Sequence, residues 1–202
     1  MDQILVKEVM DFKIQSQFPK IYACELTLDP KTAHRNLSLS EDNRKVTVVK
    51  ERRLCSGQPE RFEYWKQLLC GNSLTGRCYW EVQRQGGVHI GAAYSGIRRK
   101  TEDAEGALGS NDKSWSLYCS DESFTAWHKK TTTDIRVPPF FDTSRVAVYL
   151  DWPAGTLSFY TVTPDTLIHL HTFRSKFTEP LYPAFGFGLA AGYSVSLCQL
   201  EE

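Results

Sequence analysis

Apolar and polar residues alternate in short runs over most of the chain, and the best pattern lies in residues 146–160. This stretch reads VAVYLDWPAGTLSFY, with one alternating run on each side of a Pro- and Gly-containing centre. Alternation with a period of two sends successive side chains to opposite faces of a strand. Pro153 presets one turn dihedral and Gly155 supplies a permissive one, which is typical of a tight turn. The stretch predicts a β-hairpin that serves as scaffold.

The rest of the chain after residue 20 repeats this pattern of short extended runs. None of these segments has a helical period of twelve or more residues, which argues against an α/β nucleotide-binding fold. Many short runs separated by Gly, Asn, Asp, Ser and Pro predict a single all-β domain, a two-sheet antiparallel β-sandwich. Further runs occur at residues 45–50, 79–83, 88–94, 115–119, 124–128 and 195–200.

The segment before Pro19 has a different period. Apolar positions spaced at i, i+4 and i+7 predict a short amphipathic N-terminal α-helix over residues 2–18, and Pro19 ends it. Two interpretations remain open: a helix packed on its own domain, or the end of a coiled coil, through which the chain would form a homodimer. The stripe consists of Leu5, Val9, Phe12 and Ser16.

Charge and cysteine content favour a cytoplasmic protein. The 202 residues carry 24 Lys plus Arg and 24 Asp plus Glu, so no net field attracts nucleic acid or an anionic membrane. The six cysteines are scattered, and we expect them to be reduced thiols, because a domain of this size does not need disulfides to fold. The N-terminus lacks the apolar core of a signal peptide, and no apolar run is long enough to span a membrane.

Motifs for catalysis, metal binding or cofactor binding are missing from the sequence. His169 and His171 have workable spacing for two metal ligands, but no further ligands stand near them, and a structural zinc site needs four. The chain has no Cys-x-x-Cys, no P-loop, no Gly-x-Ser-x-Gly and no complete dinucleotide fingerprint. We therefore expect no metal, no cofactor and no enzymatic activity, although a triad assembled in space remains open.

Five blocks of sequence, in order and spacing, resemble the signature blocks of the PRY-SPRY domain. The resemblance covers the chain from about residue 22 to the C-terminus and assigns residues 21–202 to this domain, with PRY at about 22–78 and SPRY at about 79–202. Residues 1–20 would then be a helical linker or the end of a coiled coil. The blocks are LTLDPKTAHRNLSLS (26–40), YWEV (79–82), LGSNDKSW (108–115), YLDWPAGTLSFY (149–160) and FTEPLYPAF (177–185).

Within that family the chain resembles the C-terminal domain of tripartite-motif proteins. Its sequence motifs are most similar to those of the estrogen-responsive B-box member and its fish relatives. Such proteins are E3 ubiquitin ligases of innate immunity or regulation, with RING, B-box and coiled coil ahead of this domain. The resemblance implies a concanavalin-like jelly roll that recognises a protein or peptide target and is not catalytic itself.

The same resemblance implies a binding face built from loops, because a rigid sandwich presents loops that set the ligand. At the positions of Tyr118, Ser120 and Leu189, some relatives carry two tryptophans and a phenylalanine, so the pocket implied for this chain is less aromatic. The implied loops are residues 51–61, 94–106, 118–122, 129–139 and 189–193. The implied pocket residues are Tyr94, Ser95, Arg98, Tyr118, Ser120 and Leu189.

Several assignments keep two interpretations. Tyr118 and Ser120 alternate with core positions, so that side of the strand is either pocket floor or plain surface. Trp127 is either a hot-spot aromatic or a core residue, and the core interpretation is favoured because Phe124 flanks it. The loop 129–139 contains three consecutive threonines and is interpreted as a segment that orders on binding.

Three other functions stay open. The domain could be a spacer beside a self-associating helix. It could end another host: a nucleotide-binding leucine-rich-repeat receptor, a butyrophilin or a stonefish-type toxin, and oxidised cysteines would point to the toxin host. RNA binding is disfavoured by the neutral charge, although Arg52, Arg53 and Arg61 could line up with the basic run 98–100.

Overall fold

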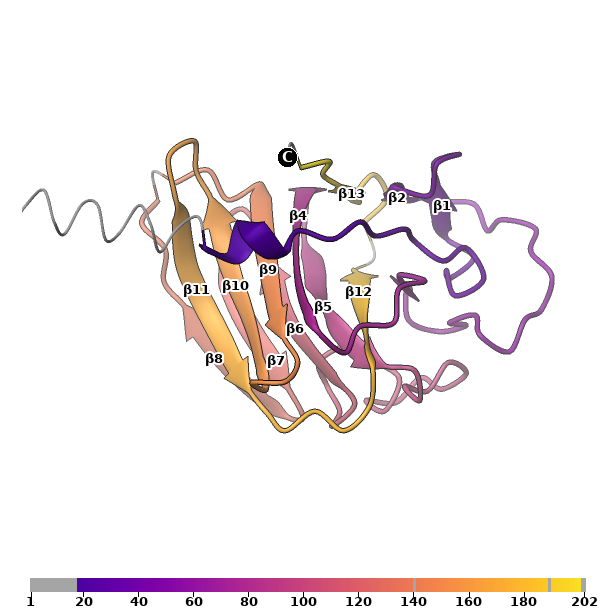
Figure 1. The fold of residues 1–202 in the computed structure, drawn as a ribbon. Helices are drawn as coiled ribbons and strands as arrows, with labels where there is room; N and C mark the ends of the chain where they lie inside the picture. Colours follow the sequence, from indigo (N-terminus) through magenta and orange to yellow (C-terminus); the bar gives the residue numbers. More distant parts are fainter. Residues whose placement is uncertain (1–17, 140, 189, 201–202) are drawn as a thin grey trace, which may run out of the picture.

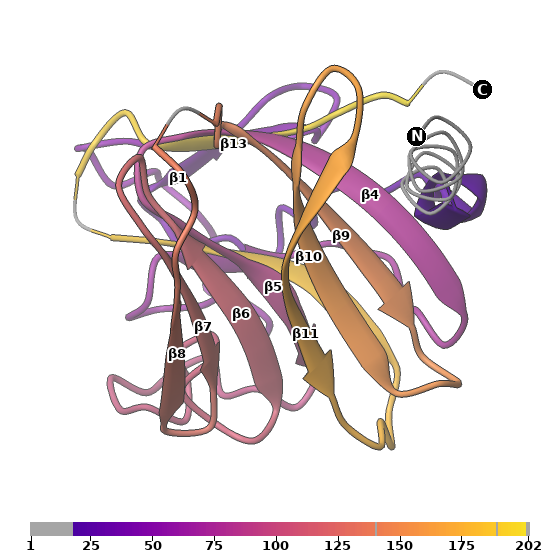
Figure 2. The ribbon, with the colours of Figure 1, turned by 90° about the vertical axis from the view of Figure 1, so that its left-hand side faces the viewer.

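Two antiparallel β-sheets stacked face to face make up the fold (Figure 1, Figure 2). The structure is a computed structural model that describes residues 18–139, 141–188 and 190–200. A 3-10 helix, η1 (Phe18–Tyr22), precedes the strands. The strands are β1 (Leu37–Leu39), β2 (Lys45–Val48), β3 (Gln67–Leu69), β4 (Arg77–Gln85), β5 (Val88–Tyr94), β6 (Ser114–Cys119), β7 (Phe124–His128), β8 (Thr131–Ile135), β9 (Arg145–Asp151), β10 (Thr156–Val162), β11 (Leu167–Arg174), β12 (Leu181–Phe187) and β13 (Ser194–Leu197).

The order of strands joins distant parts of the chain. The seven-stranded sheet runs β1-β2-β13-β4-β9-β10-β11 and the six-stranded sheet runs β3-β12-β5-β6-β7-β8. β13 lies between β2 and β4, so the C-terminal strand closes the middle of one sheet (Figure 1). This arrangement confirms the predicted all-β two-sheet antiparallel sandwich. The predicted helix over residues 2–18 lies outside the described residues, and among the described residues the only helix is the 3-10 turn η1.

The predicted hairpin is confirmed as β9 and β10. Leu150 pairs with Leu157 across the turn, and Gly155 adopts a φ of 73°, which a residue with a side chain rarely adopts. The carboxylate of Asp151 accepts a hydrogen bond from the N–H of Ala154 and closes the turn. Leu150 and Leu157 are both buried between the sheets, as the alternation predicts.

Large apolar side chains fill the space between the sheets. Trp115, Phe159 and Phe185 are each at most 2% exposed, and Trp80 is 3% exposed. Burial of each such side chain stabilises the fold by about 1.5–3 kcal/mol. Trp80 and Trp115 are therefore packing residues of the core.

Two local expectations are wrong. The three threonines of the loop 129–139 form the edge strand β8, which pairs with β7 along its whole length, because β-branched residues suit an extended strand. Cys24 and Cys78 are not free thiols: the structure joins them in a disulfide, with the two Cα atoms 5.5 Å apart. An isolated bridge between Ala23 and Tyr79 brings these cysteines together, 54 residues apart in the chain.

Candidate functional site

The outward side of the six-stranded sheet carries a group of side chains that the core does not use. Leu117 of β6 is fully buried in the core, so its neighbours on either side in the strand point away from the sandwich interior. Strand pairing then aligns two outward rows across β5, β6 and β7. We call these residues the outer face: His89, Tyr118 and Thr125 in one row, and Gly91, Ser116 and Trp127 in the next.

The ring of His89 contacts two other aromatic rings of the outer face. The ring of His89 lies 5.0 Å from that of Tyr118 and 5.9 Å from that of Trp127, centroid to centroid. All three side chains are partly exposed. Because Tyr and Trp offer large, stiff contact areas, such clusters carry much of the energy at protein interfaces.

The structure indicates the protonation state of one polar group of the outer face and the hydrogen bonding of another. Burial lowers the pKa of His89 to about 4, so its imidazole is neutral at pH 7, and Nδ1 lies 3.1 Å from Oγ of Ser116. The indole nitrogen of Trp127 is buried and has no hydrogen-bond partner among the described residues. A neutral aromatic surface with an unpaired donor suits a protein or peptide ligand that supplies a carbonyl oxygen.

The loop between β5 and β6 covers the other half of the same sheet face. Leu108 packs with Phe62 and Ile97 in a separate buried cluster, and its N–H donates to the side-chain oxygen of Gln67. A side chain at Gly109 would meet Ser116 and Trp127, so this loop borders the outer face directly. The loop therefore leaves the part of this sheet face over β5, β6 and β7 uncovered.

A hollow of about 600 Å³ lies beside the outer face, between the β6–β7 turn and the segment from β8 to β9. We call it the rim hollow. Its charged residues are three acids and one arginine, and most of its other lining residues are apolar. The lining residues are Asp121, Glu122, Ser123, Phe124, Asp134, Ile135, Arg136, Val137, Pro138, Pro139, Phe141 and Thr143.

The predicted pocket residues fall at opposite ends of β5. Tyr118 pairs with His89 near the start of β5, and Ser120 follows in the turn after β6. Tyr94 is the last residue of β5, five residues further on, which is about 17 Å along a strand. Ser95 and Arg98 follow Tyr94 and are exposed. The structure thus places Tyr118 on the outer face and Ser120 directly before Asp121 of the rim hollow, and it places Tyr94, Ser95 and Arg98 at the other end of β5.

Tyr94 belongs to the core. It is 7% exposed, its ring packs edge-on against Trp115 at 5.2 Å, and its hydroxyl accepts a hydrogen bond from the N–H of Thr178. Leu189 lies outside the described residues. The role of all six residues in partner binding stays a prediction.

Sequence reasoning favoured the core for Trp127, and the structure puts its ring on the outer face. Trp127 contacts His89 and is absent from the core clusters, whereas Phe124 and Ala126 of the same strand are buried in the core. The sequence pattern could have predicted this outward position. Phe124 and Ala126 are two residues apart and share one face of the strand, whereas Trp127 is one residue from Ala126 and therefore faces the opposite side.

The basic residues considered for RNA binding are largely used inside the protein. Arg61 is 6% exposed and donates to the carbonyl oxygens of Pro30 and Ala33. Arg99 lies over the ring of Phe62 at 4.9 Å. Lys100 pairs with the Glu63 carboxylate at 2.8 Å. Arg99 and Lys100 thus join the loop 94–101 to the loop 51–63, and Arg61 joins the loop 51–63 to residues 30–33.

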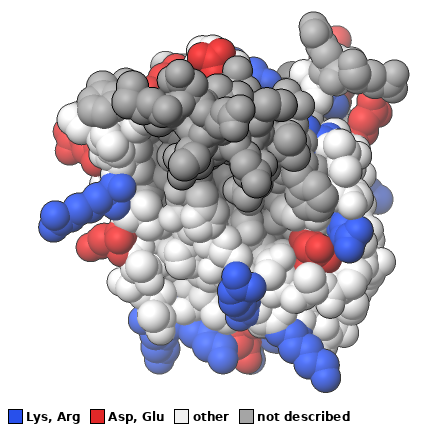
Figure 3. All heavy atoms as spheres, turned by 60° about the vertical axis from the view of Figure 1, so that its left-hand side comes forward, with Lys and Arg blue, Asp and Glu red and all other residues white. Residues whose placement is uncertain are grey.

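Charge is dispersed on the surface seen in Figure 3, where basic and acidic side chains lie scattered among uncharged ones. In the described part of the chain, no group of three or more His, Cys, Asp or Glu residues could hold a metal ion. No helix within the described ranges is long and apolar enough to cross a membrane.

Comparison with known proteins finds two family models on this chain. The model of the SPRY-associated domain PRY matches residues 26–74, and the model of the SPRY domain matches residues 77–200. Among solved structures, the TRIM65 PSpry domain has a TM-score of 0.80 and 29% identity, over 91% of this chain and 94% of that one. The resemblance to PRY-SPRY domains predicted from the sequence is confirmed.

Relatives come from two kinds of host. The stonustoxin beta subunit of Synanceia horrida is 45% identical over 170 residues, which cover 83% of this chain and 24% of that protein. Tripartite motif-containing protein 16 of Mus musculus is 43% identical over 167 residues, covering 81% of this chain and 30% of that protein. The chain thus spans less than a third of the length of either relative. It belongs to the SPRY domain family, with the SPRY-associated PRY segment ahead of the SPRY domain.

Proposed function

We propose that this chain is the target-recognition module of a tripartite-motif E3 ubiquitin ligase, of innate-immune or regulatory type, whose RING lies in another part of the parent protein. SPRY domains are binding modules and typically non-catalytic, which agrees with the absence of catalytic motifs from the sequence. The similarity to tripartite motif-containing proteins 16 and 14 supports this host. A cytoplasmic location and a coiled-coil dimer ahead of residue 20 belong to the same proposal.

The observation that carries the proposal is the aromatic cluster of His89, Tyr118 and Trp127. These rings contribute little to the sandwich core, and the buried indole N–H of Trp127 has no hydrogen-bond partner among the described residues. An acceptor supplied by a partner would satisfy it. Protein interfaces concentrate their binding energy in such aromatic groups.

The rim hollow adds a preference for charge. Asp121, Glu122 and Asp134 outnumber Arg136 there, and most of the other lining residues are apolar. A ligand segment with apolar residues and a Lys or Arg would complement this rim, and opposite charge speeds encounter and fixes register.

The test is site-specific photocrosslinking in cell lysate with the full 202-residue chain. A crosslinking amino acid at Thr132, which pairs with Trp127 and is exposed, probes the border of the outer face. The matched control places it at His169, which is exposed on the seven-stranded sheet. We expect a protein band at Thr132 that is absent at His169.

Variants of the outer face then test the cluster itself. Tyr118→Ala and Trp127→Ala should each abolish the crosslinked band while the circular dichroism spectrum stays unchanged. The captured protein should also become ubiquitinated when it is expressed with the parent protein, and not with a parent that carries Trp127→Ala. Equal bands at Thr132 and His169, or a band that survives both variants, would remove the outer face as the binding surface.

A toxin-like host is the second candidate, and the disulfide between Cys24 and Cys78 favours it. Disulfides persist in oxidising compartments and are rare in the cytosol. Stonustoxin subunits are among the relatives of this chain. If the parent protein is recovered from the culture medium of expressing cells with that disulfide formed, the ligase host is excluded.

A further inference from the structure

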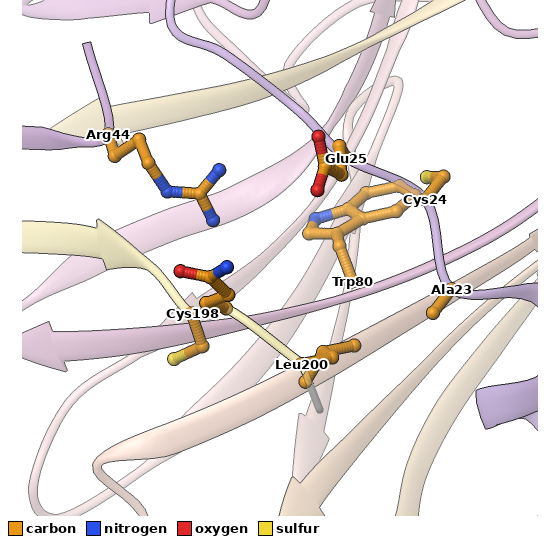
Figure 4. A pocket seen from close by; sticks show the side chains of 8 residues that line it. Ala23, Cys24, Glu25, Arg44, Trp80, Cys198 and Leu200 are labelled. Atoms are coloured by element: carbon orange, nitrogen blue, oxygen red, sulfur yellow. The ribbon is translucent and has the colours of Figure 1, made fainter. Parts of the chain in front are cut away.

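A small cavity of about 140 Å³ lies beside β4 in the seven-stranded sheet, away from the outer face. Two terminal segments of the described chain meet there, residues 23–25 and residues 198–200. A protein cavity of about 150 Å³ holds one benzene molecule, so this one has room for about six non-hydrogen atoms. The lining residues are Ala23, Cys24, Glu25, Arg44, Trp80, Cys198, Gln199 and Leu200 (Figure 4).

The indole nitrogen of Trp80 is an unused donor in this cavity. Trp80 is 3% exposed, and its Nε1 has no hydrogen-bond partner among the described residues. Figure 4 shows this nitrogen on the edge of the ring that faces Arg44. Since a buried N–H without an acceptor is unfavourable, an acceptor atom in the cavity would stabilise the protein.

Arg44 supplies further donors from the opposite side. Its guanidinium reaches the carbonyl oxygens of Leu26 and Leu197 only at 3.4 and 3.5 Å, which are long hydrogen bonds. A guanidinium has five N–H donors, so most of those of Arg44 remain for a ligand. Two converging donors, one of them cationic, select an anionic oxygen, and a carboxylate fits them best.

Glu25 gives the cavity a second, opposite charge. Figure 4 shows Glu25 and Arg44 on either side of the cavity. The two groups form no ion pair within 4.0 Å, and among the described residues no side-chain partner of the Glu25 carboxylate is found. A ligand that carries an ammonium group beside its carboxylate would pair with both.

We propose that this cavity binds a small zwitterion of the free amino acid class. The ligand carboxylate accepts hydrogen bonds from Arg44 and from Nε1 of Trp80, and its ammonium group lies against Glu25. The volume restricts the ligand to the size of glycine or alanine. This site is independent of the proposed function, because it lies on the other sheet from the outer face.

The experiment follows the indole N–H signal of Trp80 in proton–nitrogen correlation spectra of the full chain. The chain has five tryptophans, and Trp80→Phe identifies the signal by its loss. Glycine should shift this signal saturably and leave the other indole signals in place. Acetate, which lacks the ammonium group, should bind about tenfold more weakly, and glycine methyl ester, which lacks the carboxylate, should not shift the signal.

Matched variants test the roles of the charges of Arg44 and Glu25 in glycine binding. Arg44→Gln should abolish the shift, and Arg44→Lys should retain part of it. Glu25→Gln should reduce the affinity for glycine to that for acetate, with the backbone amide signals of distant strands unchanged. Trp80→Phe keeps an aromatic side chain but removes the donor together with the pyrrole part of the indole, so calorimetry should detect weaker glycine binding in that variant.

Three results would overturn the proposal. The first is the absence of any saturable shift of the Trp80 signal with glycine. The second is a shift that persists unchanged in Arg44→Gln while the fold is intact. The third is equal affinity for acetate and glycine in the unmodified chain, which would exclude the role of Glu25 and the zwitterion.

Discussion

The guanidinium of Arg84 lies 3.2 Å from the carboxylate of Asp121 and joins a side chain that is 1% exposed to one that is 86% exposed. Arg84 also donates to the carbonyl oxygens of Gly86 and Ser120 and to both oxygens of Thr143. One buried cation therefore ties together the turn after β4, the turn after β6 and the segment before β9. Two of these segments, the turn after β6 and the segment before β9, line the rim hollow, so Arg84 is a positioning residue for the candidate site.

Replacing Arg84 by Met should lower the free energy of unfolding by about 2–3 kcal/mol, because buried carbonyl oxygens lose their donor. Asp121→Asn is the matched control: its carboxylate is exposed, so the loss should stay below about 1 kcal/mol. Urea unfolding of the three proteins measures both values. Equal losses in the two variants would contradict the assignment, since they would locate the effect in the exposed ion pair.

Stability should fall as the pH is lowered from 6.5 to 4, through His34 and His89. Burial lowers the pKa of His34 to about 4, with the nearby cations Lys66, Arg52 and Arg35 acting in the same direction, and burial alone lowers that of His89 to about 4. In this window the unfolded chain, whose histidines titrate near 6.5, binds more protons than the folded one. Each histidine can remove up to about 3 kcal/mol at the acid end of the window.

Urea unfolding at pH 7, 5.5 and 4.5 measures this loss, and His89→Gln isolates one of the two contributions. The variant should lose less stability on acidification than the unmodified chain, although its stability at pH 7 is lower. Parallel pH dependence in the two proteins would show that His89 does not titrate as its burial requires.

Thiol alkylation should separate the paired cysteines from the free ones. The structure leaves Cys55, Cys70, Cys119 and Cys198 as free thiols. Mass spectrometry of the chain alkylated in denaturant should therefore find four modified cysteines before reduction and six after it. Cys24→Ser should lower the free energy of unfolding by about 2–4 kcal/mol under oxidising conditions and much less under reducing ones. Six modified cysteines without a reductant would mean that the pair is not joined.

Gly109 and Gly192 form a natural pair for testing the loop that borders the outer face. Both have a left-handed backbone, with φ of 85° and 90°. A Cβ at Gly192 would meet no atom within 4 Å, whereas one at Gly109 would meet Ser116 Oγ and lie 2.8 Å from the Cβ of Trp127. Gly192→Ala should cost about 1–2 kcal/mol from backbone strain alone, and Gly109→Ala should cost at least about 1 kcal/mol more.

Thermal unfolding of both alanine variants measures these costs. Gly109→Ala should in addition shift the indole signal of Trp127, and Gly192→Ala should not. If Gly192→Ala proves the more harmful substitution, the loop at Gly109 does not lie against the outer face.

Local pattern alone determined much of this protein. The alternation in residues 146–160, with Pro153 and Gly155 at its centre, specified a hairpin, because strand period and turn chemistry are properties of adjacent residues. The same reasoning specified two antiparallel sheets. The ordered sequence blocks specified the SPRY family.

Tertiary structure alone decided how the candidate site is assembled. His89 and Tyr94 are five positions apart along β5, and this length of strand separates two groups of residues that the family resemblance had joined in one pocket. A list of sequence positions does not contain that distance. The pairing of Cys24 with Cys78 and the gathering of three segments around Arg84 likewise depend on which strands become neighbours. Contacts between residues far apart in the chain follow from the packing of the two sheets, and the local pattern of a single segment does not encode them.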